Sequence, residues 1–133
     1  MSEEKKIKVV LLEPDKLART AEIGTSIEDL QNAVDGLIEP FYPFEEQVCI
    51  VCNDEGKING MLPNRSVKNK DGVMVDFIFG PAFICDCRGE SFDSLSDEQI
   101  ARYTKMFRYP EHLARLNGKL IGIPLNPQRE HER

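Results

Sequence analysis

Short apolar runs alternate with polar turns along this chain, and the pattern predicts a domain built largely of strands. The runs are rich in β-branched residues and end at Pro, Gly, Asn or Asp, as strands do. The break at Gly80-Pro81 separates the last two of them. Strands are expected at residues 5–13, 18–23, 47–53, 73–79 and 82–87.

Two segments have a helical pattern instead. Thr25 with Glu28 and Ser96 with Gln99 have capping-box spacing, and Ser26 overlaps the first of these as a weaker start. The apolar positions that follow share one helical face, at Ile27, Leu30, Val34 and Leu37 in the first helix and at Ile100, Tyr103 and Phe107 in the second. A shorter helical turn is expected from Pro110 to Asn117-Gly118.

This order of elements predicts an α+β domain with a mixed, largely antiparallel sheet and two main helices. A ubiquitin-like opening of hairpin, helix and returning strand is one arrangement that fits. Residues 1–125 are expected to form a single domain, as the length of 133 residues suggests, and residues 126–133 a flexible polar tail. Residues 40–44 and 61–65 are expected to be an aromatic connector and an irregular turn.

The charges are unevenly distributed. The chain has 17 basic and 23 acidic residues, a net charge of −6 that argues against wholesale nucleic-acid binding. Residues 20–56 contain nine acids and no Lys or Arg. Either these acids solvate the surface, or they form one face that attracts a basic partner or mimics a polyanion. The candidate residues of this acidic face are Glu39, Glu45, Glu46, Asp54 and Glu55.

A basic loop follows the acidic segment. Pro63 fixes its own φ and Asn64 suits a turn, so the pair is expected to hold Arg65 outward. In the functional interpretation this loop contacts phosphate or an acidic partner through Asn64, Arg65, Lys68 and Lys70. In the structural interpretation Asn64 caps a turn and Arg65 pairs with a surface acid.

Four cysteines lie in two pairs, and they are the candidates for a metal site. Cys49, Cys52, Cys85 and Cys87 match the number of thiolates that tetrahedral zinc needs. Both pairs lie in strand-like runs, however, and residues 49 and 52 of one strand face opposite ways. We therefore expect core cysteines and no metal or other cofactor.

No motif of a hydrolase, zinc protease, nucleotide-binding loop or dinucleotide fold occurs in the sequence. The two histidines, His112 and His131, are not near a candidate nucleophile in sequence. An enzyme is therefore not expected. No apolar run is long enough to span a membrane and no signal-peptide pattern occurs, so a cytoplasmic protein is expected.

Several segments together resemble a known family. They are Phe41–Phe44, Val48–Gly56, Leu62–Arg65, Asp76–Ile84, Ser94–Gln99 and Tyr109-Pro110. Over about residues 7–111 the chain resembles a small uncharacterised domain carried by phages, plasmids and conjugative elements of Gram-positive bacteria. Gly80-Pro81 stands where that family often has Gly-Thr.

The resemblance brings no known activity with it, but it implies a small cytoplasmic accessory protein of a mobile element, with counter-defence or host interaction as its task. Together with the charge pattern it leads to the expectation of a non-enzymatic module that binds an unknown protein partner of the host or the element. The alternative is a nucleic-acid-binding domain that uses the basic patches at residues 57–70 and 102–119.

Overall fold

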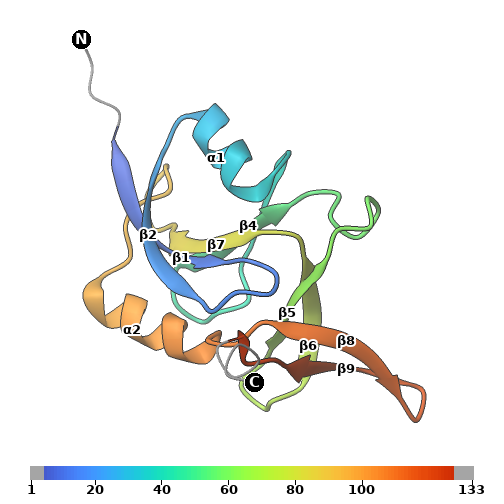
Figure 1. The fold of residues 1–133 in the computed structure, drawn as a ribbon. Helices are drawn as coiled ribbons and strands as arrows, with labels where there is room; N and C mark the ends of the chain where they lie inside the picture. The colour runs from blue at the N-terminus through green and yellow to red at the C-terminus, as the bar shows by residue number, and fades with distance from the viewer. Residues whose placement is uncertain (1–4, 128–133) are drawn as a thin grey trace.

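A five-stranded antiparallel sheet forms the centre of the molecule, shown by a computed structural model that describes residues 5–127 (Figure 1). Its strand order is β2-β1-β7-β4-β3. The first two strands form a hairpin in which Lys6 pairs with Gly24. The strands are β1 (Lys6–Leu12), β2 (Arg19–Gly24), β3 (Ile38–Phe41), β4 (Val48–Asn53) and β7 (Ala82–Asp86).

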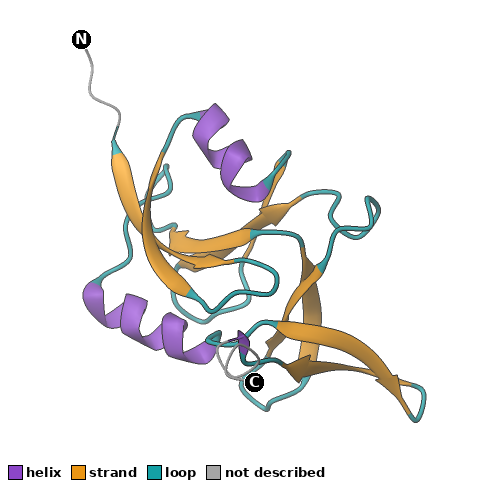
Figure 2. Cartoon of the chain, in the orientation of Figure 1, coloured by secondary structure: helices purple, strands orange, loops and turns teal. Residues whose placement is uncertain are grey.

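The central strands β1, β4 and β7 are buried on both faces, which explains their nearly continuous apolar runs. One face is covered by helix α1 (Ile27–Val34), whose Leu30 and Val34 pack on alternate residues of the three strands. The other face is covered by helix α2 (Asp97–Met106) and by strands β5 (Pro63–Lys68) and β6 (Met74–Phe79). The result is an α+β domain of three layers (Figure 2).

Both predicted main helices are confirmed, but α1 ends at Val34, so that the expected face is buried only at Leu30 and Val34, while Ile27 and Leu37 are exposed. The Ser96–Gln99 capping box is present at the start of α2. Helix α1 is capped by Ser26, whose hydroxyl accepts from the backbone N–H of Asp29, so the overlapping start is the correct one and Thr25 is not the cap.

The ubiquitin-like opening is not confirmed. The hairpin and the helix follow one another as expected. Strand β3, which returns after the helix, nevertheless lies at the edge of the sheet furthest from the hairpin and pairs only with β4. Residues 40 and 41 of the expected aromatic connector belong to this edge strand.

The predicted helical turn after Pro110 is wrong. This segment forms a second hairpin, β8 (Glu111–Leu116) and β9 (Lys119–Pro124). Its two turn residues, Asn117 and Gly118, have φ values of 52° and 81°, as the two-residue Asn-Gly turn of a hairpin requires. The expected tail at residues 126–133 lies almost entirely outside the described residues.

The expectation that Arg65 points outward is also wrong. Residues 63–68 form strand β5, and both Asn64 and Arg65 are fully buried. The Asn64 amide donates to the carbonyls of Leu12 and Gly80, at 2.8 Å each. Its oxygen accepts from the Arg65 guanidinium at 2.5 Å.

The Arg65 guanidinium joins three parts of the chain. It donates to the carbonyl of Glu13 at 3.0 Å and that of Lys16 at 2.6 Å, in the turn after β1. It also donates to Phe107 at 2.6 Å and Arg108 at 3.4 Å, at the end of α2. Burial lowers the pKa of Arg65 to about 10, against the opposing effect of Glu111 and Glu13, so the group remains charged at neutral pH.

Replacing this guanidinium should destabilise the fold strongly. We expect Arg65→Met to lower the free energy of unfolding by about 3 kcal/mol or more, because buried carbonyls lose their donors. Arg65→Lys should recover little, since an ammonium cannot reach the same forked set of acceptors. Urea unfolding of these variants, with the exposed Lys68→Met as control, measures the effect. A loss below about 1 kcal/mol would contradict it.

Candidate functional site

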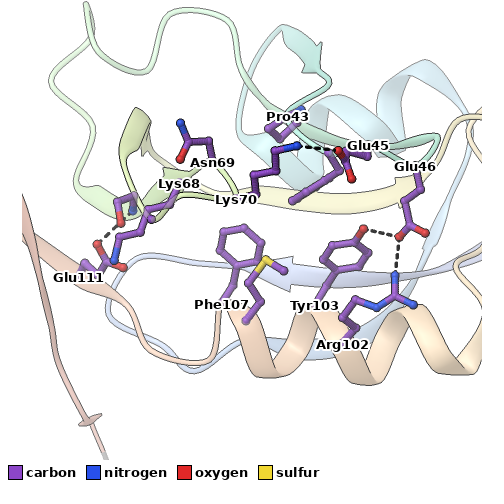
Figure 3. A pocket seen from close by; sticks show the side chains of 14 residues that line it. Pro43, Glu45, Glu46, Lys68, Asn69, Lys70, Arg102, Tyr103, Phe107 and Glu111 are labelled. Carbon is purple, nitrogen blue, oxygen red and sulfur yellow. Dashed lines mark hydrogen bonds and ion pairs between the residues drawn. The ribbon is translucent and has the colours of Figure 1, made fainter.

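A groove of about 830 Å³ opens between helix α2, the segment that follows β3, and the β5–β6 turn (Figure 3). Its apolar floor is aromatic. The ring of Phe44 lies 4.7 Å from that of Tyr103 and 6.2 Å from that of Phe107, measured between centroids. Met106 adds an apolar side chain that is 56% exposed. A groove with an apolar floor and a few placed polar groups is the usual form of a binding site.

The local sequence explains why these rings meet. Tyr103 and Phe107 are four residues apart and therefore lie on the same side of α2. Pro43 directs the chain so that Phe44 packs against both of them and against the core of this face. The floor is thus part of the folded core and is formed in the absence of a ligand.

One carboxylate of the groove is engaged by its neighbours through one oxygen, Oε1. Glu46 accepts hydrogen bonds from the Tyr103 hydroxyl and from Arg102, the latter at 2.7 Å. The hydrogen bond from the Tyr103 hydroxyl is the largest effect on the pKa of Glu46, and it lowers this pKa. Burial raises the pKa to a smaller extent, and Arg102 and Gln99 lower it further. Burial, and then Glu46, raise the pKa of Tyr103 to about 12. Glu46 is therefore a weak base, held in place as an anion.

The cations on the opposite wall are more available. Lys70 lies 3.5 Å from Glu45, but the two side chains are 79% and 89% exposed, so water competes strongly for this ion pair. Lys68 is exposed, and no carboxylate of residues 5–127 forms an ion pair with it. Glu111, by contrast, accepts from the backbone N–H of Ser66 at 3.1 Å.

The predicted acidic residues do not gather on one surface. Glu45 and Glu46 precede strand β4 and line the groove, whereas Asp54 and Glu55 follow the same strand and line a second hollow with Glu39. A six-residue strand separates the two groups by about 20 Å. The second hollow also contains Lys57, which pairs with Asp76 at 2.9 Å. Other acids of the segment, such as Glu22 on β2, lie at the opposite edge of the sheet.

The predicted basic loop is divided too. Asn64 and Arg65 belong to the core, while Lys68 and Lys70 reach the groove. The structure thus brings part of each predicted charged site, Glu45 and Glu46 on one side and Lys68 and Lys70 on the other, to the walls of a single groove (Figure 3). The sequence places Phe44 in an aromatic connector and Tyr103 and Phe107 on the apolar face of a helix. Nothing in it singles out Arg102, Met106 or Glu111.

The four cysteines do not converge. Cys49, Cys85 and Cys87 are on the face covered by α1, whereas Cys52 is on the opposite face. Among the described residues no group of three or more Cys, His, Asp or Glu side chains is arranged to hold a metal ion. His112 lies in β8, 3.7 Å from Asp15, and His131 is outside the described part of the chain.

The fold and the groove define a small α+β domain with an apolar groove between α2 and the two-stranded β5–β6 sheet. The chain belongs to a family described as a domain of unknown function, DUF3846, whose model matches residues 7–108. The groove-forming helix lies inside this match, and the β8–β9 hairpin follows it. No curated protein and no solved structure matches the chain. In residues 5–127 no helix has the length and apolarity to cross a membrane.

The Tyr103–Glu46 contact leads to a prediction about stability and pH. Tyr103→Phe should lower the free energy of unfolding by about 1.5 kcal/mol at pH 7, because a charged acceptor loses its donor. The folded-state pKa of Glu46 is below its usual value of 4.5, so this stabilisation is complete above that pH and is lost as pH falls further.

Chemical denaturation at pH 7 and at about pH 3 tests this, and the difference in stability between the wild type and the variant should be smaller at the lower pH. Tyr42→Phe is the matched control, because the Tyr42 side chain is 64% exposed and should give no change at either pH. An equal loss at both pH values would show that the contact does not depend on the Glu46 charge.

Proposed function

We propose that this protein is a non-enzymatic interaction module that binds a partner protein in the groove between α2 and the β5–β6 turn. The observation that carries the proposal is that, around an apolar floor, the acidic and the basic side chains differ in how strongly other groups of the protein bind them. The acids Glu46 and Glu111 are already engaged by donors of the protein, and Glu45 and Lys70 form a loose, exposed pair, so that Lys68 is the groove cation that no acid of the described residues pairs with.

This difference between the acids and the lysines of the groove indicates the chemistry of the partner. A segment that places an apolar side chain on the Phe44–Tyr103–Phe107 floor meets the two lysines on one wall. Carboxylates beside an apolar anchor complement this arrangement better than cations do. The partner we propose is therefore an extended, acidic protein segment. The alternative of docking by an acidic face has less support, because its five residues are divided between two hollows.

We also propose a biological setting for this binding. The protein acts in the cytoplasm as an accessory of a phage or mobile element, in counter-defence or host interaction, and occludes a site on a partner from the host or the element. The support for this setting is the resemblance of the residues given under Sequence analysis. Membership of a family of unknown function adds no activity to it.

A binding measurement tests the groove. Fluorescent peptides with one Leu or Phe anchor flanked by Asp and Glu should bind more tightly at low salt than the same peptides with Lys in place of the acids. In the Lys68→Glu/Lys70→Glu variant the affinity for the acidic peptides should fall about tenfold or more. Lys119→Glu, an exposed charge on the β9 strand, is the control and should change little. Tighter binding of the basic peptides would refute the proposal.

Nucleic-acid binding is the second candidate, and one observation favours it. Strands β5 and β8 pack together, so that the two predicted patches are neighbours in the structure. Their exposed basic residues are Lys57, Lys68, Lys70, Arg102, Lys105, Arg108, Arg115 and Lys119.

A mobility-shift assay at low salt with single- and double-stranded DNA and RNA tests this candidate. If it is correct, the protein shifts at least one probe at micromolar concentration, and Arg115→Glu/Lys119→Glu weakens the shift and its salt dependence. Because these two substitutions leave the groove intact, the assay separates nucleic-acid binding from peptide binding. The absence of a shift would rule the second candidate out.

A further inference from the structure

Three thiols lie together on the sheet face that α1 covers, on the side of the sheet away from the groove. Cys49 of β4 and Cys85 of β7 are fully buried, and their sulfur atoms are 3.7 Å apart. Cys87, just beyond the end of β7, also interacts with Cys49 and is partly exposed. The cluster therefore reaches the surface at Cys87.

The strand register singles out one pair. Cys49 and Cys85 lie directly opposite each other in the antiparallel β4–β7 pairing. Such partners have Cα atoms about 4.5–5.5 Å apart, within the range that a disulfide spans. Cys49 and Cys87 are diagonal neighbours at about 7–8 Å, which is too far without movement of the backbone. Cys85 and Cys87 are two residues apart on one extended segment, so their Cα atoms are about 6.6 Å apart. This distance is at the upper limit of the range that a disulfide spans.

We propose that Cys49 and Cys85 are a redox-active pair that a peroxide converts into an intramolecular disulfide. The Cys49 sulfur attacks one oxygen of the peroxide, the O–O bond breaks, and a sulfenic acid and one molecule of water or alcohol form. The Cys85 sulfur then attacks the sulfenic sulfur, the S–O bond breaks, and water leaves. Two thiols are oxidised and one peroxide is reduced. The 3.7 Å gap closes to a bond of about 2.05 Å.

The electrostatics of the cluster agree with these roles. The contact with the Cys85 thiol, and to a smaller degree that with Cys87, lowers the pKa of Cys49 against the opposing effect of burial. The same contact and burial raise the pKa of Cys85. Cys49 is thus the thiol that most readily supplies the nucleophilic thiolate, and Cys85 the one that resolves the sulfenic acid.

The chain contains its own control. Cys52 is on the same strand as Cys49 but on the opposite face, where burial raises its pKa to about 11. Its sulfur lies 3.5 Å from the carbonyl of Glu39. Cys52 should therefore remain a thiol under conditions that oxidise the pair.

Peptide mapping of the purified full-length chain tests the proposal. After treatment with hydrogen peroxide, alkylation and trypsin digestion, tandem mass spectrometry locates the bond between the tryptic peptides 20–57 and 71–88, each of which contains two cysteines. We expect a Cys49–Cys85 link that dithiothreitol removes, and an intact mass lower by about 2 Da. The bond closes a loop between residues 36 positions apart, so the thermal midpoint should rise by about 10 °C.

Substitutions distinguish the pair from its neighbours. Cys52→Ser and Cys87→Ser should retain the linked peptide, and Cys85→Ser should abolish it. If Cys85→Ser fails to fold, the mapping of the wild-type chain decides alone. A link through Cys87 or Cys52, a link between two chains, or four thiols that all remain alkylatable would overturn the proposal. None of these outcomes depends on whether the groove binds a peptide.

Discussion

The buried guanidinium of Arg65 is the constraint on which the arrangement of the layers depends. Its partners are backbone carbonyls at the end of β1 and at the end of α2, two segments that no strand pairing connects. A charge removed from water is tolerated only where its donors are satisfied, and here four carbonyls and the Asn64 amide oxygen satisfy them. Strand β5 is thereby fixed against the main sheet and against the helix at the same time.

The groove is a consequence of that fixed position. Strand β5 has its buried end at Asn64 and Arg65 and its exposed end at Lys68, so the interaction that anchors the strand also determines where its lysines stand. The same Arg65 group bonds the carbonyl of Phe107, whose ring is part of the floor. The aromatic floor of the groove and the wall that contains Lys68 are thus both positioned by the Arg65 side chain. A preformed groove of this kind costs little ordering of the protein when a ligand binds, and its affinity depends mainly on the ligand.

Much of the fold could be predicted from local pattern, and the exceptions have physical causes. The apolar runs of β1, β4 and β7 and the capping box at Ser96 are local signals, and each appears in the structure where expected. The β8–β9 hairpin was missed because the helical interpretation of Pro110 outweighed Asn117-Gly118, whose positive φ angles determine the turn. The burial of Arg65 has no local signal: its acceptors come from residues 42 to 52 positions away. For the same reason the groove was predicted only in fragments, as charges without the aromatic floor between them.

The alternation of side chains along β4 keeps the two proposed sites physically separate while linking them through one strand. Cys49 and Val51 face α1, and Val48 and Ile50 face the core beneath the aromatic floor of the groove. A bond between Cys49 and Cys85 joins partners that are already opposite each other, so it fixes an existing register and does not impose a new one. The side chains on the other face keep their places under Tyr103. Oxidation of the pair is therefore expected to act on the stability of the sheet, and the shape of the groove is set by the contacts of Arg65 and Phe44 on the opposite face.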